Sequence, residues 1–295
     1  MPALDWPNTP NLILRIGGDA AFQQRAARAL DKINQCPAGN TLLTQLRALR
    51  INGRGNVGIA LPDAQQTSKC AFLDVASSNC RTMLAQAVLD NVGSAMTEIQ
   101  QALAATPAAI ANPAQWLANA INQTPIYNIQ GLPNAAPSNL GVATADVQGW
   151  LNNAAAFPHT ANGANVQNLT LALLVALWPG ARTRPGNGGH CRVHWTESTS
   201  IGLTTGVRRT RPKSVGLAHE LIHAYYSVSG LQMGIDINHY STAIFEYMCV
   251  GLGPWAAEPI SENAIRAGFA NVVKSTHFKG RLRINYRALI ARPCY

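Results

Sequence analysis

Two histidines separated by three residues are the feature of this sequence best suited to chemistry. They lie in the stretch His219-Glu-Leu-Ile-His223, which reads as a helix with apolar residues between the histidines. Residues i and i+4 share one face of a helix, so both imidazoles can point at one metal ion. Glu220 can reach a water beside that ion and act as a general base. The pattern therefore predicts a zinc site with hydrolytic chemistry.

A blander interpretation of the same stretch is a buried helix with two core histidines bonded to backbone groups. Leu217, Ala218, Leu221 and Ile222 indeed predict that the helix is buried. Burying polar side chains without partners costs several kcal/mol, however, and a metal ion removes that cost. We therefore favour the metal site.

A zinc site needs a third protein ligand, and Glu246 is the candidate we favour. The metzincin pattern would require Gly at position 226 and His at 229, but the chain has Tyr226 and Ser229, which excludes that class. Glu246 lies in an otherwise apolar segment, residues 243–250, that predicts a second helix. A lone carboxylate in such a helix needs a partner, and zinc is one.

Other polar residues near the motif are weaker candidates for a metal ligand or for an oxyanion-stabilising group. Weaker ligand candidates are Asp236, His239, Glu258 and Glu262. Glu262 can instead favour the positive end of the next helix. Hydrolysis also requires a group that stabilises the oxyanion, and we name Tyr240 and Arg266 for that role.

The first sixty residues predict a strand, two helices and a second strand. Asp19 is expected to cap the first helix, and residues 37–39 to separate it from a second helix that opens at Asn40 or Thr41. The four expected elements span residues 12–16, 20–34, 40–49 and 56–61.

The second half predicts a strand, the motif helix and two further helices. Residues 190–195 alternate as a strand, which we expect to be an edge strand that pairs with an extended substrate, with His190 and His194 facing solvent. Ser214 is expected to cap the motif helix, which ends near Gly230. A terminal helix is expected over residues 262–273.

We expect residues 1–12 to form an irregular leader and residues 13–295 to form a single domain. An uncharged Ala/Asn-rich insertion at about 65–168 is expected to be helical, with helices near 84–103 and 113–121, and a buried helix is expected over 168–178. Asp146 is the only charged residue from 101 to 180. Disorder usually goes with high net charge, so we do not read the segment as disordered.

Charge and composition narrow the class of protein. The net charge of +9 favours acidic partners, and the basic stretches at 204–213 and 274–292 are either solvated surface or anion contacts. No segment has the length of a membrane span, and the N-terminus shows no signal-peptide pattern. The six cysteines form no CxxC pair, so we expect free thiols, although their even number leaves disulfides open.

Three stretches resemble the NleD-type effector zinc metalloproteases of Gram-negative pathogens. They are Val215-Gly-Leu-Ala-His-Glu-Leu-Ile-His-Ala-Tyr225, preceded by Arg211-Pro212, then Phe245-Glu-Tyr-Met-Cys-Val-Gly251, and Pro259-Ile-Ser-Glu-Asn-Ala-Ile-Arg266. The resemblance implies a zinc endopeptidase with His219 and His223 as ligands, Glu220 as base and Glu246 as third ligand. It also implies delivery by type III secretion into the host cytoplasm, and a mitogen-activated protein kinase activation loop as a substrate to test.

These observations together predict an α+β, zincin-like metalloprotease. We expect a helix-rich chain with a small mixed sheet, the His-Glu-x-x-His helix and a following helix that carries Glu246. We expect it to act as a monomer on a host protein, such as a protein kinase. The alternative is a catalytically silent basic module that binds a host protein or nucleic acid. Nucleic acid is disfavoured because the basic residues are not interleaved with aromatic ones.

Overall fold

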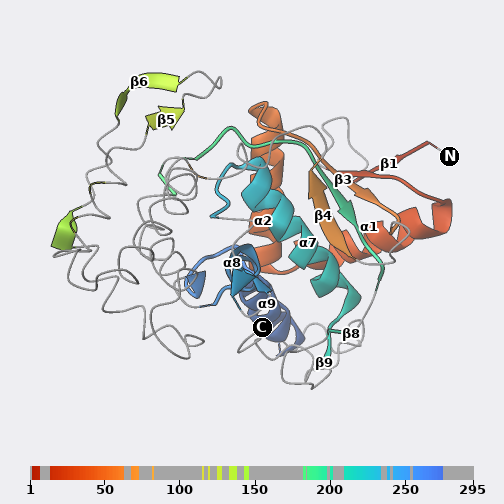
Figure 1. The fold of residues 1–295 in the computed structure, drawn as a ribbon. Coiled ribbons are helices and arrows are strands. Elements are labelled where there is room, and N and C mark those ends of the chain that lie inside the picture. The colour runs from red at the N-terminus through yellow and green to blue at the C-terminus, as the bar shows by residue number, and fades with distance from the viewer. Residues whose placement is uncertain are drawn as a thin grey trace. The chain divides into compact units, whose positions relative to one another are not determined.

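The structure is a computed structural model (Figure 1). It describes residues 2–6, 14–62, 68–72, 82, 115, 119, 125–127, 133–137, 143–145, 182–183, 185–197, 200–201, 209–233, 238–239, 242–252 and 255–274. Two compact units can be distinguished, one formed by residues 1–80, 188–230 and 245–295 and the other by 81–187 and 231–244. The His219-Glu-x-x-His223 motif lies in the first unit.

A five-stranded mixed sheet forms one layer of the first unit. Its strands are β1 (Leu4–Trp6), β2 (Leu14–Ile16), β3 (Val57–Ala60), β4 (Lys69–Phe72) and β7 (Cys191–His194). Their order is β1-β2-β3-β7-β4, with β2, β3 and β7 parallel and the two outer strands antiparallel to their neighbours. Alternate residues are buried, as in Leu14, Ile16, Val57 and Ile59. The described part of the chain is thus α+β, helix-rich with a small mixed sheet.

Two features of this sheet differ from the sequence-based prediction. β7 lies between β3 and β4, so it is not an edge strand, and among the described strands β4 takes the outer position. The segment expected to be an irregular leader contains β1, in which Leu4 pairs with Ile16. Three prolines obscured this strand in the sequence, but Trp6 is buried and its indole Nε1 donates to Asp31 at 2.8 Å.

The expected strand–helix–helix–strand order is confirmed, with helices α1 (Ala20–Asn34) and α2 (Pro37–Ile51) between β2 and β3. The side chain of Asp19 caps α1 as predicted, accepting from the Phe22 amide at 2.7 Å. α2 begins at Pro37, three residues earlier than expected. The fixed φ and missing N–H of proline suit the first helical position, and the Cys36 thiol accepts from the Gly39 amide at 3.3 Å.

Helix α7 (Lys213–Val228) carries the motif through the middle of the first unit (Figure 1). It contacts α1, α2, α9, β4 and β7, and all but two of its residues are buried. The predicted cap was wrong: Pro212 occupies the N-cap position without a side-chain bond, and Ser214 lies inside the helix. The helix ends as expected, with Ser229 as C-cap and Gly230 at φ 70°.

The two following helices pack next to the motif helix. They are α8 (Ile244–Val250) and α9 (Glu262–Lys274), so the expected helix over 262–273 is confirmed. Gly251 ends α8 at φ 79°, where a side chain would strike the Ser261 hydroxyl. The Ser261 hydroxyl in turn accepts from the Ala264 amide at 3.2 Å and caps α9. These contacts bring the end of α8 against the start of α9.

The remaining described elements are short strand pairs. They are β5 (Pro125–Tyr127) with β6 (Pro133–Pro137), β8 (Ser200–Ile201) with β9 (Arg209–Thr210), and β10 (Asn238–His239) with β11 (Thr242–Ala243). The helices predicted near 84–103 and 168–178 lie outside the described residues, and only positions 115 and 119 represent the one near 113–121. None of the described helices is long and apolar enough to cross a membrane.

Candidate metal centre

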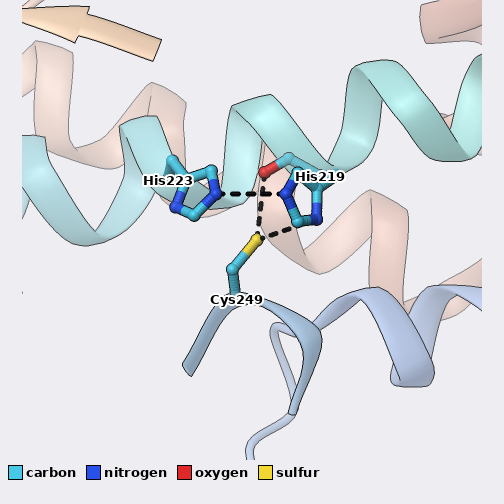
Figure 2. Close-up of side chains that lie close together, drawn as sticks. All are labelled: His219, His223 and Cys249. Carbon is cyan, nitrogen blue, oxygen red and sulfur yellow. Dashed lines mark hydrogen bonds between the residues drawn. The ribbon is translucent and has the colours of Figure 1, made fainter. Parts of the chain in front are cut away.

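The two motif histidines lie side by side on the buried face of α7 (Figure 2). Their Nε2 atoms are 3.1 Å apart, with the rings nearly perpendicular at 89°. Phe245 packs edge-on against His223, with ring centroids 4.9 Å apart. Buried imidazoles at this spacing are held by packing on a single rigid helix, which is what a preorganised pair of ligands requires.

Glu246 on α8 completes a three-residue cluster with these histidines. One carboxylate oxygen lies 3.1 Å from Nε2 of His219, and the other lies 3.2 Å from Nε2 of His223. The Glu246 side chain keeps 24% of its surface exposed, whereas the imidazoles are almost fully buried. The cluster is therefore closed on the helix side and reachable from the side of Glu246.

The donor atoms fit a tetrahedral zinc ion. With zinc–ligand bonds of ~2.0–2.1 Å, tetrahedral geometry places two ligand atoms about 3.3 Å apart. The two Nε2 atoms are 3.1 Å apart, one Glu246 oxygen lies 3.1 Å from Nε2 of His219 and the other oxygen lies 3.2 Å from Nε2 of His223, each close to that value. Two neutral nitrogens and one carboxylate are a donor set that zinc takes in hydrolytic enzymes, with a fourth position left open. The residues thus fit the metal that the sequence predicts.

Cys249, one turn after Glu246 on α8, is a neighbour that sequence reasoning did not single out. Its Sγ lies 3.3 Å from Nδ1 of His219 and 3.2 Å from the His219 carbonyl oxygen (Figure 2). His219, His223 and Cys249 could also group around a metal by proximity alone. The charge of Cys249 acts on His223 as well as on His219. The two histidines therefore have two possible third ligands on α8, Glu246 and Cys249.

Glu262 contacts His219 at the same distal nitrogen. Its Oε2 lies 2.8 Å from Nδ1 of His219, and its side chain is fully buried. Arg266 donates from Nε to Oε1 of this carboxylate at 2.7 Å, and Nη1 of Arg211 lies 3.7 Å from Oε2. Sequence reasoning treated Glu262 as a helix-end charge. The i, i+4 spacing of Glu262 and Arg266 was the available signal for their pairing.

This arrangement gives Arg266 a different position from the one expected. It was predicted to stabilise the oxyanion, but its guanidinium is buried against Glu262, whose carboxylate lies beside Nδ1 of His219. Arg211 was expected in a solvated or anion-binding basic stretch, yet it too is buried beside this carboxylate. The reason in both cases is a buried negative charge that the sequence pattern does not reveal.

The other predicted residues have the following positions. Glu220 is buried on α7 directly after His219. Tyr240 and Asp236 lie outside the described residues, His239 is in β10, and Glu258 is a half-buried residue before α9. His190 and His194 are half-buried and bond backbone groups: Nδ1 of His190 accepts from the Asn56 amide, and Nδ1 of His194 lies 2.7 Å from the Leu61 carbonyl oxygen.

Burial and neighbouring charges shift the pKa values of His219, His223 and Glu246 in opposite directions. Burial lowers the pKa of both histidines, but the charges of Cys249 and Glu246 raise it more, so the pKa of His219 lies well above its usual range and that of His223 rises to about 10. Burial raises the pKa of Glu246, but the two imidazoles hold it well below its usual range. Without a metal ion, the two histidines therefore tend to keep an extra proton while Glu246 stays negatively charged.

Comparison with known protein families assigns the chain to one of them. The family model Peptidase_M91, described as "Effector protein", matches residues 11–267. The chain belongs to the Peptidase_M91 family. The match covers the motif helix, Glu246 and Glu262, and it confirms the resemblance to NleD-like effector peptidases. No significant match is found to a curated protein or to a solved structure.

Membership of Peptidase_M91 indicates the general class of activity and of substrate for this chain. The family is a class of metallopeptidases, so the chain is a peptidase, and its substrate is a protein. The family description also makes it an effector. The four cysteines in the described part, Cys36, Cys70, Cys191 and Cys249, are free thiols.

Proposed function

We propose that this Peptidase_M91 member is a zinc-dependent endopeptidase with a zincin-like catalytic domain. The observation that carries the proposal is that the Nε2 atoms of His219 and His223 lie 3.1 Å apart and that each faces a different oxygen of the Glu246 carboxylate, at 3.1 and 3.2 Å. Burying two imidazoles and a carboxylate costs free energy unless these groups have partners. A bound metal ion is a better partner for all three than they are for one another. We assign these three residues as the metal ligands.

The proposed mechanism gives the metal site and Glu220 separate roles in hydrolysis. Bound at this site, zinc would polarise the scissile carbonyl and make the attacking water more acidic. Glu220, one residue after the first ligand, takes a proton from that water and delivers it to the departing amine. The almost fully buried walls formed by α7 limit the entry of bulk water and strengthen charge interactions. Tyr240 remains our candidate for oxyanion stabilisation.

We further propose that the protein acts in the cytoplasm of a host cell after type III secretion, as a monomer. The description of the family as effector proteins supports an action inside a host cell. The resemblance to NleD-type proteases extends the proposal to protein kinases, with a mitogen-activated protein kinase activation loop as the first sequence to test. The net charge of +9 suits an acidic protein partner.

The proposal is tested with the purified full chain. Zinc content is measured by elemental mass spectrometry, and candidate host kinases are incubated with the protein, with chelator, and with chelator followed by zinc. About one zinc per chain and cleavage that chelator abolishes and zinc restores are expected. A double variant, His219→Ala with His223→Ala, is the control and should bind no zinc. Cleavage that is indifferent to chelator, or a wild-type chain that takes up no zinc, would refute the proposal.

A further inference from the structure

The five-stranded sheet has a second face, which the described helices leave exposed. On the first face, alternate residues of β2, β3 and β7 are buried in the core. On the second face, Arg15 and Arg192 are exposed, and Gly58 and Ala60 are half-buried. Side chains of a strand alternate between the two faces, so these four residues lie on one surface, here called the outer face. The proposed hydrolysis makes no use of it.

Strand register places a glycine between two arginines on the outer face. Gly58 of β3 pairs with Arg15 of β2 on one side and with Arg192 of β7 on the other. Neighbouring strands lie about 4.8 Å apart, so the Cα atoms of the two arginines are about 10 Å apart. Ala60 follows in the next row of this face, and Lys69 of β4 lies in the same row, one strand beyond β7. Two small residues of β3 therefore form a floor with basic side chains on both sides.

Gly58 is a glycine that the sheet itself does not require. A Cβ at this position would meet only the carbonyl oxygen of Arg15, at 3.7 Å, and the backbone is not in the positive-φ region. The register with both neighbouring strands is continuous here, so there is no bulge. Glycine inside a strand weakens it, and it often marks a place where a ligand or another backbone approaches closely. A chain that approaches the outer face would explain this glycine, whereas the sheet does not.

The two arginines of the outer face are available to an external partner. The Arg15 side chain is 74% exposed, and its Nε lies 3.9 Å from Oδ1 of Asp5, which is beyond hydrogen-bonding distance. The guanidinium of Arg192 is exposed and makes no ion pair or hydrogen bond with any described residue. Asp5 is the only acidic residue among the outward positions of the five described strands. The outer face therefore has an excess of positive charge.

We propose that the outer face of the sheet is a docking surface for an extended, acidic segment of a protein partner. Arginine binds carboxylates through paired N–H donors. Successive side chains of an extended segment point to opposite sides, so two adjacent acidic residues lying over Gly58 would reach Arg15 and Arg192. The outward positions of the described strands carry no Phe, Tyr or Trp on which bases could stack, which favours a protein over single-stranded nucleic acid. The docking surface does not depend on the proposed zinc site.

The test uses the full chain and two synthetic peptides that differ only in charge. One peptide carries a run of consecutive glutamates between Gly-Ser flanks, and the other carries glutamines in their place. Both carry a fluorescent label, and binding is followed by anisotropy at low ionic strength. We expect only the acidic peptide to bind, with a Kd that rises steeply with salt. The protein is treated with chelator beforehand, so a failure of the zinc proposal would leave this result unchanged.

Two double variants separate the outer face from the general positive charge of the chain. Arg15→Ser with Arg192→Ser should weaken binding of the acidic peptide at least about tenfold, because it removes two partly exposed charge pairs. Arg28→Ser with Arg47→Ser is the matched control, since it removes the same charge from exposed positions on α1 and α2. The control should change the Kd by less than about twofold.

A third variant, Gly58→Val, tests the face even if the double arginine variant does not fold. Valine suits a strand and its Cβ has room, so the melting temperature should stay the same or rise. Its side chain would occupy the floor of the outer face, so binding of the acidic peptide should weaken roughly fivefold or more.

Several outcomes would overturn the docking proposal. They are equal binding of the two peptides, equal weakening by the two double variants, and unchanged binding in Gly58→Val. A single-stranded oligothymidylate that binds more tightly than the acidic peptide, and that loses affinity in the Arg15 and Arg192 variant, would also overturn it, because the outer face would then bind nucleic acid.

Discussion

Glu246 and His223 belong to different helices, yet Oε1 of the glutamate lies 3.2 Å from Nε2 of the histidine. The second carboxylate oxygen reaches His219 in the same way. A short helix, α8, therefore supplies the third member of a cluster whose first two members are fixed on α7. The catalytic proposal depends on this relationship more than on any other in the molecule.

The first prediction concerns that third ligand. Glu246→Gln should weaken zinc binding by more than about 100-fold, since it removes a ligand rather than a neighbour of one. Chelator competition gives the affinity, and elemental mass spectrometry gives the metal content after dialysis. Glu258→Gln is the control, because Glu258 was the other nearby candidate and lies in the segment before α9. Equal loss in both variants would show that Glu246 has no special role.

The second prediction separates the base from the ligands. Glu220→Gln should lower kcat about 10²–10⁴-fold, the usual contribution of general acid–base catalysis. Zinc content should not change, because we do not assign Glu220 as a ligand. The cleavage rate of a host kinase and the metal content of the same sample are compared with wild type. A Glu220→Gln protein that cleaves at the full rate would exclude Glu220 as the base.

Local signals in the sequence predicted much of this structure. The motif spacing placed two imidazoles on one face, and Asp19 before an amphipathic stretch placed the start of α1. Glu246 stood out because a carboxylate in an apolar helix is costly without a partner. Each of these inferences needs only the periodicity of one element and the chemistry of one residue.

The contacts behind His219 could not be predicted in the same way. Arg266 was assigned to the substrate and Glu262 to a helix end, because each was read from its own segment. Their positions depend on α9 packing against α7, and no local pattern encodes that packing. The outer position of β4 is a similar case, because the order of strands in a sheet depends on pairing across more than a hundred residues.

The third prediction decides between Glu246 and Cys249 as the third ligand. X-ray absorption at the zinc edge should show only nitrogen and oxygen neighbours at about 2.0–2.1 Å and no sulfur at about 2.3 Å. Cys249→Ser should then keep the metal and the same spectrum. A sulfur shell in wild type that disappears in Cys249→Ser would instead establish a His219, His223 and Cys249 site.

The last prediction concerns pH and follows from the raised pKa of His223. The folded pKa is about 10, against a reference of 6.5, so the metal-free folded protein keeps a proton that the unfolded chain loses. The resulting stability is fully present below pH 6.5 and is lost as the pH rises toward 10. The slope is up to about 1.4 kcal/mol per pH unit for each retained proton.

Zinc reverses this dependence because its histidine ligands must be neutral. The melting temperature of the metal-free chain should fall between pH 7 and 9, as roughly set by these titrations, while the gap between zinc-loaded and metal-free protein widens. Calorimetry of both forms across this range measures the gap, and proton release on zinc addition in weak buffer gives an independent value. His223→Gln should remove the part of this slope that His223 contributes, while the raised pKa of His219 supplies the rest. A gap that is constant with pH would mean that zinc does not compete with protons at this cluster.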